Sequence, residues 1–256
     1  MSYSSSSSIS SNDEPNHAEK VLTFRPTAQQ FSNFPKYIKY LESRGAHKAG
    51  ICKIIPPENW TPNKELKKTQ YKSTFGLTID TPIQQTFISS GNQARFTCIN
   101  EEKPRMKVAD IHKMSEKPKY SPPTNVMTLQ DLESKYWKNI KFNPPTYGSD
   151  HGGSLFSSET KDWNMSKLNS VLDCVKLGQD KIDDIPGVTS PYLYFGMWRS
   201  SFCWHREDCN LYALNYLHHG CSKQWYAIPP KHAKKFLGLA KRLQGGFINN
   251  VRFSVG

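Results

Sequence analysis

Three short runs of aromatic and apolar residues in the second half of the chain constrain its fold more than any other feature. They cover 192–204, 211–217 and 224–228, and turn-forming Gly220 and Pro229 punctuate them. Short β-rich runs separated by turns are typical of an antiparallel sandwich or barrel. Helical patterns occupy much of the remaining sequence, so we expect an α+β protein.

The N-terminal part predicts a small module behind a Ser-rich tail. Residues 1–20 are too polar to offset their ordering entropy, and we expect this tail to be disordered. We then expect a strand over 21–26 and a helix capped by Thr27. Pro35 should divide that helix into two pieces. A C-cap at Gly45 and a second strand over 51–57 should follow.

The middle of the chain predicts further mixed structure. Residues 58–80 are polar and Lys-rich, and we expect a long surface connection there. A strand over 82–88 and helices over 106–117, 128–138 and 230–243 follow from their periodicity. The resulting division places the tail at 1–20, the N-terminal module at 21–62, a connecting region at 63–150 and the last unit at 151–256.

Composition limits the class of protein. The 34 Lys and Arg against 22 Asp and Glu give a net charge of +12, which fits either an anionic, chromatin-like environment or a solubility device. No stretch approaches the roughly 18 apolar residues of a membrane helix, so we expect no membrane partner. The six Cys include no C-x-x-C pair, which favours a reducing compartment.

The motif His205-Arg206-Glu207 follows the first aromatic run. On a strand, positions two apart share a face, so this imidazole and carboxylate can occupy two adjacent positions around one metal. A further His would complete the triad of a non-haem Fe(II) oxygenase. The motif alone is weak, because chance supplies roughly 0.7 matches in this composition, and His17-Ala18-Glu19 is a second match in the tail.

The interpretation of the motif as a metal site is strengthened by Asn215 and Lys223, which follow it in the sequence. Asn215 has the same strand parity as His205 and Glu207, although a structural amide is an equal alternative. Lys223 lies where the third run begins, and a buried Lys needs an anion such as a dicarboxylate. A solvated turn lysine is the alternative for Lys223.

Several motifs carry a family resemblance. TFRPT at 23–27, YIKYLESRGAHKAG at 37–50 and IIPPENW at 54–60 resemble a JmjN domain. Three later segments resemble a JmjC domain, namely KYWKNIKFNPPTYGSDHGG at 135–153, GVTSPYLYFGMWRSSFCWHRED at 187–208 and LYALNYLHHGCSKQWYAIPP at 211–230. Over about 21–243 the chain therefore resembles the JmjN/JmjC histone lysine demethylases that act on trimethylated lysines nine and thirty-six of histone H3.

The resemblance implies a role for each candidate residue. His205 and Glu207 would be the first two Fe(II) ligands. The cosubstrate 2-oxoglutarate would be held by Tyr147, Asn215 and Lys223, with Phe202 packed on it. The methyl-lysine channel would be formed by Gly187, Tyr192 and Tyr194. Without the resemblance, the tyrosines on the 192–204 run would be interpreted as core packing and Tyr147 as a turn residue.

The resemblance also implies an activity and a fold. The activity is an Fe(II)- and 2-oxoglutarate-dependent dioxygenase reaction that oxidises a lysine N-methyl group to formaldehyde. Its partner would be the methylated histone H3 tail in nuclear chromatin, with nucleosomes as the natural context. The fold would be a JmjN domain packed on the opening half of a JmjC double-stranded β-helix, which is a jelly-roll relative.

The sequence departs from the family pattern near its C-terminal end. The family's third iron ligand is a more distant His, and its structural zinc has Cys ligands near the end of the catalytic domain. Only His218, His219 and His232 follow the motif here, and no Cys follows Cys221. We therefore expect an incomplete β-helix, no structural zinc and doubtful turnover. The alternatives are a catalytically dead chromatin-binding isoform or fragment, and a related oxygenase with another protein substrate.

Overall fold

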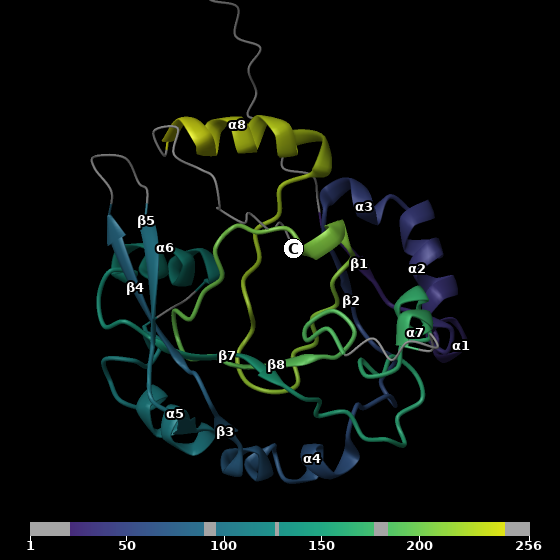
Figure 1. Cartoon of the computed structure of the whole chain (residues 1–256), viewed down its shortest axis with the longest axis horizontal. Helices are drawn as coiled ribbons and strands as arrows, with labels where there is room; N and C mark the ends of the chain where they lie inside the picture. The colour runs from purple at the N-terminus through teal and green to yellow at the C-terminus, as the bar shows by residue number, and fades with distance from the viewer. Residues whose placement is uncertain (1–20, 90–95, 126–127, 177–183, 244–256) are drawn as a thin grey trace, which may run out of the picture.

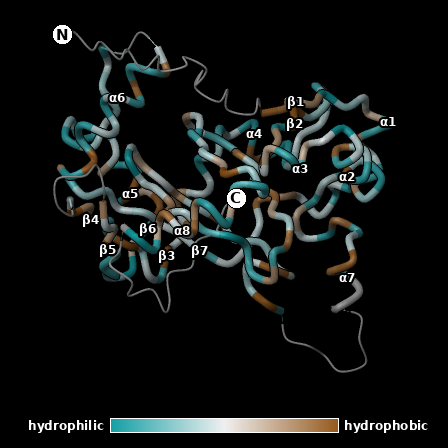
Figure 2. Tube along the Cα trace, turned by 90° about the horizontal axis from the view of Figure 1, so that it is seen from above, coloured by the Kyte–Doolittle hydropathy of each residue, from teal (hydrophilic) through white to brown (hydrophobic). Residues whose placement is uncertain are grey.

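The computed structural model describes residues 21–89, 96–125, 128–176 and 184–243, with side chains of 174–176 left out (Figure 1). The expected α+β architecture is confirmed. The N-terminal strands and helices lie on one side of the molecule, and β4, β5, α5 and α6 lie on the other, as Figures 1 and 2 both show. The Ser-rich tail falls outside the described residues. None of the described helices is long and apolar enough to cross a membrane.

The N-terminal module contains two short parallel strands around three helices. In chain order these are β1 (Leu22–Phe24), α1 (Ala28–Phe31), α2 (Phe34–Ser43), α3 (Ala46–Ala49) and β2 (Cys52–Ile54). Local signals produce each boundary. The Thr27 hydroxyl accepts a hydrogen bond from the Gln30 N–H in a capping box, and Pro35 lies in the first turn of α2. Gly45 follows α2 with φ +84°, a left-handed turn that favours glycine.

This module completes its core with a residue from much later in the chain. Trp163 is buried among Phe31, Tyr37 and Leu41, and its ring stacks on Phe31 with centroids 4.6 Å apart. The Trp163 Nε1–H donates to the Phe31 carbonyl oxygen at 2.8 Å. Leu214 also packs against the same cluster. The N-terminal module is therefore docked onto the second half of the protein, as expected.

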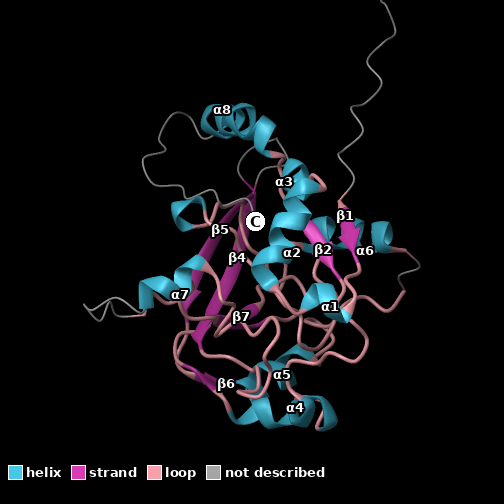
Figure 3. Cartoon of the chain, turned by 90° about the vertical axis from the view of Figure 1, so that its right-hand side faces the viewer, coloured by secondary structure: helices cyan, strands magenta, loops and turns pink. Residues whose placement is uncertain are grey.

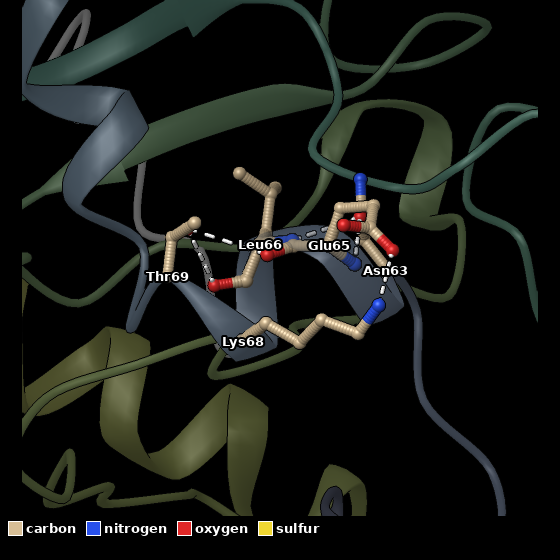
Figure 4. A network of polar contacts seen from close by, with 5 residues as sticks. All are labelled: Asn63, Glu65, Leu66, Lys68 and Thr69. Carbon is tan, nitrogen blue, oxygen red and sulfur yellow. Dashed lines mark hydrogen bonds and ion pairs between the residues drawn. The ribbon is translucent and has the colours of Figure 1, made fainter.

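The predicted surface connection over 58–80 is wrong in part. It contains α4 (Lys64–Lys68), the 3₁₀ helix η1 (Lys72–Gly76) and β3 (Thr78–Ile79). Asn63 caps α4, because its Oδ1 accepts from the Glu65 and Leu66 N–H groups, each at 3.1 Å (Figure 4). The Lys-rich composition reflects the solvated face of α4, whereas Ile79 is only 1% exposed and lies in a core.

A four-stranded antiparallel sheet follows the N-terminal module in the chain. Its order is β5 (Phe96–Glu102), β4 (Ile83–Ser89), β7 (Thr146–Gly152) and β8 (Tyr192–Phe195). A separate pair joins β3 to β6 (Met106–Lys107). The helix α5 (Val108–Ser115) contacts β7, and Trp137 of α6 (Leu129–Asn139) stacks on Phe96 of β5. The helix α7 (Val171–Lys176) lies apart from the sheet, on the same side of the molecule as α1 and α2 (Figures 1 and 2). Thr128 and Asp131 form a capping box at the start of α6, where the sequence predicted that the helix begins.

A second core packs against β7 and β8. Its buried members are Ile79, Val108, Ile111 and Met197, with Phe195 of β8 packed against them. Gly148 of β7 allows this close approach. A Cβ added there would lie 3.1 Å from Ile79 Cγ1, so a larger residue would require the Ile79 side chain or the strand to shift by a few tenths of an ångström.

The predicted strands of the last region are mostly wrong. The 192–204 run forms a strand only in β8, and the structure assigns no strand to the described segments 211–217 and 224–228 (Figure 3). A strand requires a neighbour that takes up its backbone hydrogen bonds, and apolar alternation does not supply one. The 211–217 segment instead packs on the N-terminal module, where the Tyr216 ring lies 5.5 Å from Trp60.

Short helices and one longer helix complete the described chain. They are the 3₁₀ helices η2 (Asp208–Asn210) and η3 (Pro230–His232), and α8 (Ala233–Leu243). The predicted helix over 230–243 is therefore confirmed. Phe236 of α8 contacts Trp204, with ring centroids 5.1 Å apart. This contact attaches α8 to the segment that leads into His205.

We predict that Trp163 controls the stability of the N-terminal module. Trp163→Phe retains a stacking ring but removes the donor to the Phe31 carbonyl, so the free energy of unfolding should fall by about 1 kcal/mol. Trp163→Ala also leaves a cavity and should cost about 3–5 kcal/mol. Urea denaturation measures both values. Trp137→Ala, at a half-exposed aromatic position, is the control with a smaller loss, and equal losses for all three variants would contradict the prediction.

Candidate active site

An aromatic cluster at the β7–β8 end of the sheet contains five of the candidate residues. We define the cluster as Tyr147 of β7, Tyr192 and Tyr194 of β8, and Phe202 and His205 from the segment after β8. The Phe202 ring is its centre. Its centroid lies 5.2 Å from Tyr147, 5.5 Å from Tyr194 and 5.7 Å from His205.

Strand β8 places its two tyrosines side by side. Tyr192 and Tyr194 are two positions apart and share a face, and their rings meet edge to face at 6.4 Å. Both are half-buried, whereas Tyr147 is 4% exposed. Burial, followed by the charges of Asp150 and Glu207, raises the pKa of Tyr194, so its hydroxyl keeps its proton.

Gly187 borders the cluster at a position that only glycine fits. Its φ is +80°, and an added Cβ would lie 2.6 Å from Cε2 of Tyr192. The Gly187 N–H donates to the Ser190 carbonyl at 2.8 Å, which closes a turn just before β8. The missing side chain therefore leaves the Tyr192 ring free to lie against the turn.

His205 and Glu207 converge on one side of the chain. His205 Nε2 lies 3.9 Å from Glu207 Oε1, as the two-residue spacing predicts. The two residues are not on a regular strand, in contrast to the prediction. Orientation comes instead from a hydrogen bond of 2.8 Å between His205 Nδ1 and the Cys203 carbonyl oxygen. Because a carbonyl only accepts, Nδ1 carries the proton and Nε2 presents its lone pair beside the carboxylate.

Burial adjusts the charge of both groups. It lowers the pKa of His205 to about 4, so the imidazole is neutral near pH 7. Burial, aided by the nearby charge of Asp208, raises the pKa of Glu207 above its usual value. A neutral imidazole with a free Nε2 lone pair is the form that binds a metal, and a cation would favour the ionised carboxylate.

The remaining histidines do not join this pair. Among the side chains that the structure describes, no three His, Cys, Asp or Glu residues are grouped closely enough to hold a metal ion. His218 packs against Tyr71, Phe156 and Tyr216 instead, and His219 stacks on Tyr71 at 5.3 Å. His232 lies in η3.

The two predicted cosubstrate residues after the motif differ in position. The Lys223 ammonium lies 5.7 Å from the centroid of the Tyr194 ring, so the structure brings it to the aromatic cluster. Loss of hydration lowers its pKa. Asn215 is exposed, and none of the contacts found among the described residues joins it to the cluster.

Sequence reasoning missed Asp150, which fixes Tyr194. A β-bulge interrupts the β7–β8 register between Gly148 and His151, and Asp150 within it has φ +54°. The Tyr194 hydroxyl donates to Asp150 Oδ1 at 3.2 Å. The only available signal was the turn-like sequence Gly148-Ser149-Asp150 in the segment 135–153 that resembles a JmjC domain, and such a sequence does not reveal a bulge.

Two buried polar residues that sequence reasoning also missed hold the segment that carries the motif. The Gln85 side chain of β4 makes a reciprocal pair with Ser201, accepting from its N–H and donating to its carbonyl, each at 2.8 Å. Arg199 has φ +73° and is 5% exposed. Its guanidinium donates to the backbone carbonyls of Lys119, Asn139, Phe142 and Asn143.

Comparison with known proteins identifies two domains. The jmjN domain profile matches residues 22–56, and the profile described as JmjC domain, hydroxylase, matches residues 192–252. Mouse lysine-specific demethylase 4B is 44% identical over 221 residues, which is 86% of this chain and 19% of the relative. Rat lysine-specific demethylase 4D is 42% identical over 226 residues, 88% of this chain and 42% of the relative.

A third relative shows the same pattern. Human probable lysine-specific demethylase 4F is 41% identical over 231 residues, which is 90% of this chain and 35% of the relative. The chain thus spans between about a fifth and about two fifths of the length of these curated relatives. The matched region includes both the N-terminal module and the candidate active site.

We predict that His218 makes stability depend on pH. Burial lowers its pKa to about 4 from a usual value near 6.5, so the unfolded chain takes up the proton first. Stability should therefore fall as the pH drops from about 6.5 to about 4. His218→Phe, which removes a buried Nδ1 without a partner, should weaken this dependence, as measured by thermal unfolding at several pH values. The exposed His219→Phe is the control. Overlapping pH curves for wild type and His218→Phe would contradict the assignment.

Proposed function

Because this chain carries jmjN and JmjC domain matches and is 41–44% identical to lysine-specific demethylases, we propose that its aromatic cluster and the His205–Glu207 pair form an Fe(II)- and 2-oxoglutarate-dependent demethylase site. The single observation that carries the proposal is the convergence of the two donors, 3.9 Å apart, next to rings suited to a methylated ammonium group. We propose methylated lysine on the histone H3 tail as substrate, and nuclear chromatin as its location.

The donor set fits two adjacent positions of an iron site. His205 would bind through Nε2 and Glu207 through its carboxylate, and the His205 ring is oriented without a metal. Bound Fe(II) would supply the oxidation of a C–H bond by O₂, coupled to decarboxylation of 2-oxoglutarate. The protein's own contribution is the Cys203 carbonyl, which fixes the His205 ring before the metal arrives.

Lys223 and Tyr147 are suited to hold the distal carboxylate of 2-oxoglutarate. Lys223 is exposed, and its ammonium lies beside the Tyr194 ring, where it can pair with an anion. Burial raises the pKa of Tyr147, so its hydroxyl keeps a proton and donates to a carboxylate. Phe202, which contacts Tyr147 and His205, lies between this anion site and the metal pair. Asn215 would have to move to reach the cosubstrate.

The tyrosines of β8 are suited to the methylated lysine. A methylammonium cation is attracted to aromatic faces, and it needs no hydrogen-bond acceptor once fully methylated. Asp150 holds the Tyr194 ring in place and adds negative charge nearby. Gly187 keeps the turn beside Tyr192 clear of side chains. The arrangement would thus orient a cation beside the His205–Glu207 pair.

A catalytically inactive chromatin-binding role is the second candidate. It is favoured by one observation, namely that the described residues supply no third protein ligand beside His205 and Glu207. The two candidates share the same substrate surface and differ in metal binding and turnover. Both properties are measurable on the same protein.

We predict that His205 is essential for metal binding and turnover. The demethylase proposal requires that incubation of the chain with Fe(II), 2-oxoglutarate and a trimethylated histone H3 peptide releases formaldehyde and yields demethylated peptide by mass spectrometry. His205→Ala should abolish both, and should weaken manganese(II) binding by about tenfold or more in an EPR titration. His219→Ala is the matched control. Metal binding without turnover would support the inactive candidate, and equal metal affinity in His205→Ala and wild type would remove the metal site.

We predict that Lys223 binds the cosubstrate. Lys223→Ala removes the charge partner of one carboxylate, so 2-oxoglutarate affinity should fall by about tenfold in a calorimetric titration of manganese-loaded protein. Lys234→Ala, at an exposed position on α8, should bind 2-oxoglutarate normally. Unchanged affinity in Lys223→Ala would leave the residue as a packing partner of Tyr194 alone.

A further inference from the structure

Two cysteines that the proposed function does not use meet beside the motif. Cys98 belongs to β5, and Cys203 lies two residues before His205 in the segment after β8. Their side chains come together although they lie in distant parts of the sequence. Gln85 donates both to Asn100, which the Cys98 thiol contacts, and to the Ser201 carbonyl two residues before Cys203, and each thiol shifts the pKa of the other. Cys98 is half-buried and Cys203 is exposed, so a small oxidant in solution reaches the pair.

Hydrogen bonds around the two cysteines hold their thiols close to each other. The reciprocal Gln85–Ser201 pair fixes the backbone two residues before Cys203. The Tyr136 hydroxyl adds a hydrogen bond of 2.7 Å to Ser201 Oγ. On the other side, Cys98 lies in the β4–β5 ladder opposite Phe87, and its thiol contacts Asn100 Oδ1 at 3.4 Å. Gln85 Nε2 also donates to Asn100 Oδ1 at 3.4 Å, so the same amide holds β5 and the segment before Cys203 next to each other.

We propose that Cys98 and Cys203 form a reversible intramolecular disulfide that couples the oxidation state of the protein to the geometry of the motif. With hydrogen peroxide as oxidant, one thiol is first oxidised to a sulfenic acid and one water is released. The second sulfur then displaces hydroxide from the sulfenic sulfur, which with the thiol proton leaves as a second water. Two thiols lose two electrons and two protons, and the peroxide is reduced to two waters.

The coupling follows from the backbone of Cys203. Closing the bond brings the sulfurs to about 2.05 Å and draws Cys203 towards β5. The Cys203 carbonyl oxygen is the partner of His205 Nδ1 at 2.8 Å, so its movement turns or releases the imidazole. This second step rests on the proposed metal-binding function. In a reducing compartment such a disulfide would be transient and would report oxidation.

Peptide mapping tests the bond itself. The reduced chain is treated with hydrogen peroxide at low protein concentration, alkylated and digested, and mass spectrometry should find Cys98 linked to Cys203. The link should be absent in Cys98→Ser and in Cys203→Ser, and should persist in Cys221→Ser, which removes an exposed cysteine elsewhere. Dithiothreitol should reverse it. Recovery of the two cysteines only as unlinked or overoxidised residues would overturn the proposal.

Manganese(II) titration tests the coupling, because thiols bind this hard ion poorly. Oxidised wild type should bind manganese several-fold more weakly than reduced wild type, with recovery after dithiothreitol, and Cys98→Ser should show no such change. A Cys98–Cys203 link with unchanged manganese affinity would overturn the coupling. Absence of manganese binding in reduced protein would contradict the proposed function instead, and the peptide map would still decide the disulfide.

Discussion

The buried guanidinium of Arg199 is the interaction on which the candidate active site depends. It reaches the carbonyls at the end of α6 and in the loop that leads into β7, while its own backbone turns the chain away from β8 with φ +73°. Burial lowers its pKa, but four carbonyl acceptors compensate for much of the lost hydration. The Arg199 guanidinium thereby fixes the start of β7 and the start of the segment that carries the motif. As a consequence, Tyr147 of β7 meets Phe202 of that segment.

The sequence was informative wherever the structure is local. The N-cap at Thr27 and the start of the helix at Thr128 were predicted, since a cap needs only residues within one helical turn. The parity of His205 and Glu207 also predicted that the two donors face one way. The two donors lie 3.9 Å apart although the segment is irregular, and Glu207 keeps an extended conformation with φ −62° and ψ 150°. The hydrogen bond to Cys203, which sets the His205 ring, had no signal in the sequence.

Failures arose where structure depends on partners distant in sequence. The segments 211–217 and 224–228 have strand-like composition, but strand formation also requires a ladder neighbour, and the described chain offers them none. Trp163 belongs to the core of a module more than a hundred positions earlier, and its hydrogen bond to Phe31 confirms the contact. Asp150 and Gln85 act through a bulge and a reciprocal amide pair, and neither leaves a periodic pattern. Spacing and chemistry singled out His205, Glu207, Asn215 and Lys223, whereas the family resemblance alone named the remaining site residues. The roles of all of them stay predictions.

The chemical environment of the motif explains why a metal and an oxidant would act on the same few residues. A neutral His205 beside a Glu207 with a raised pKa is a pair that gains stability from a cation, because the cation restores the carboxylate charge that burial disfavours. The pair has little rigid support of its own. One hydrogen bond to the Cys203 carbonyl orients the imidazole, and Gln85 anchors the chain two residues earlier. Any change at Cys203 therefore reaches the ligand through a single peptide unit. Cys98 of β5 lies next to Cys203 and is sensitive to oxidation. Oxidation of the two thiols would therefore act on the His205 ring through this one peptide unit.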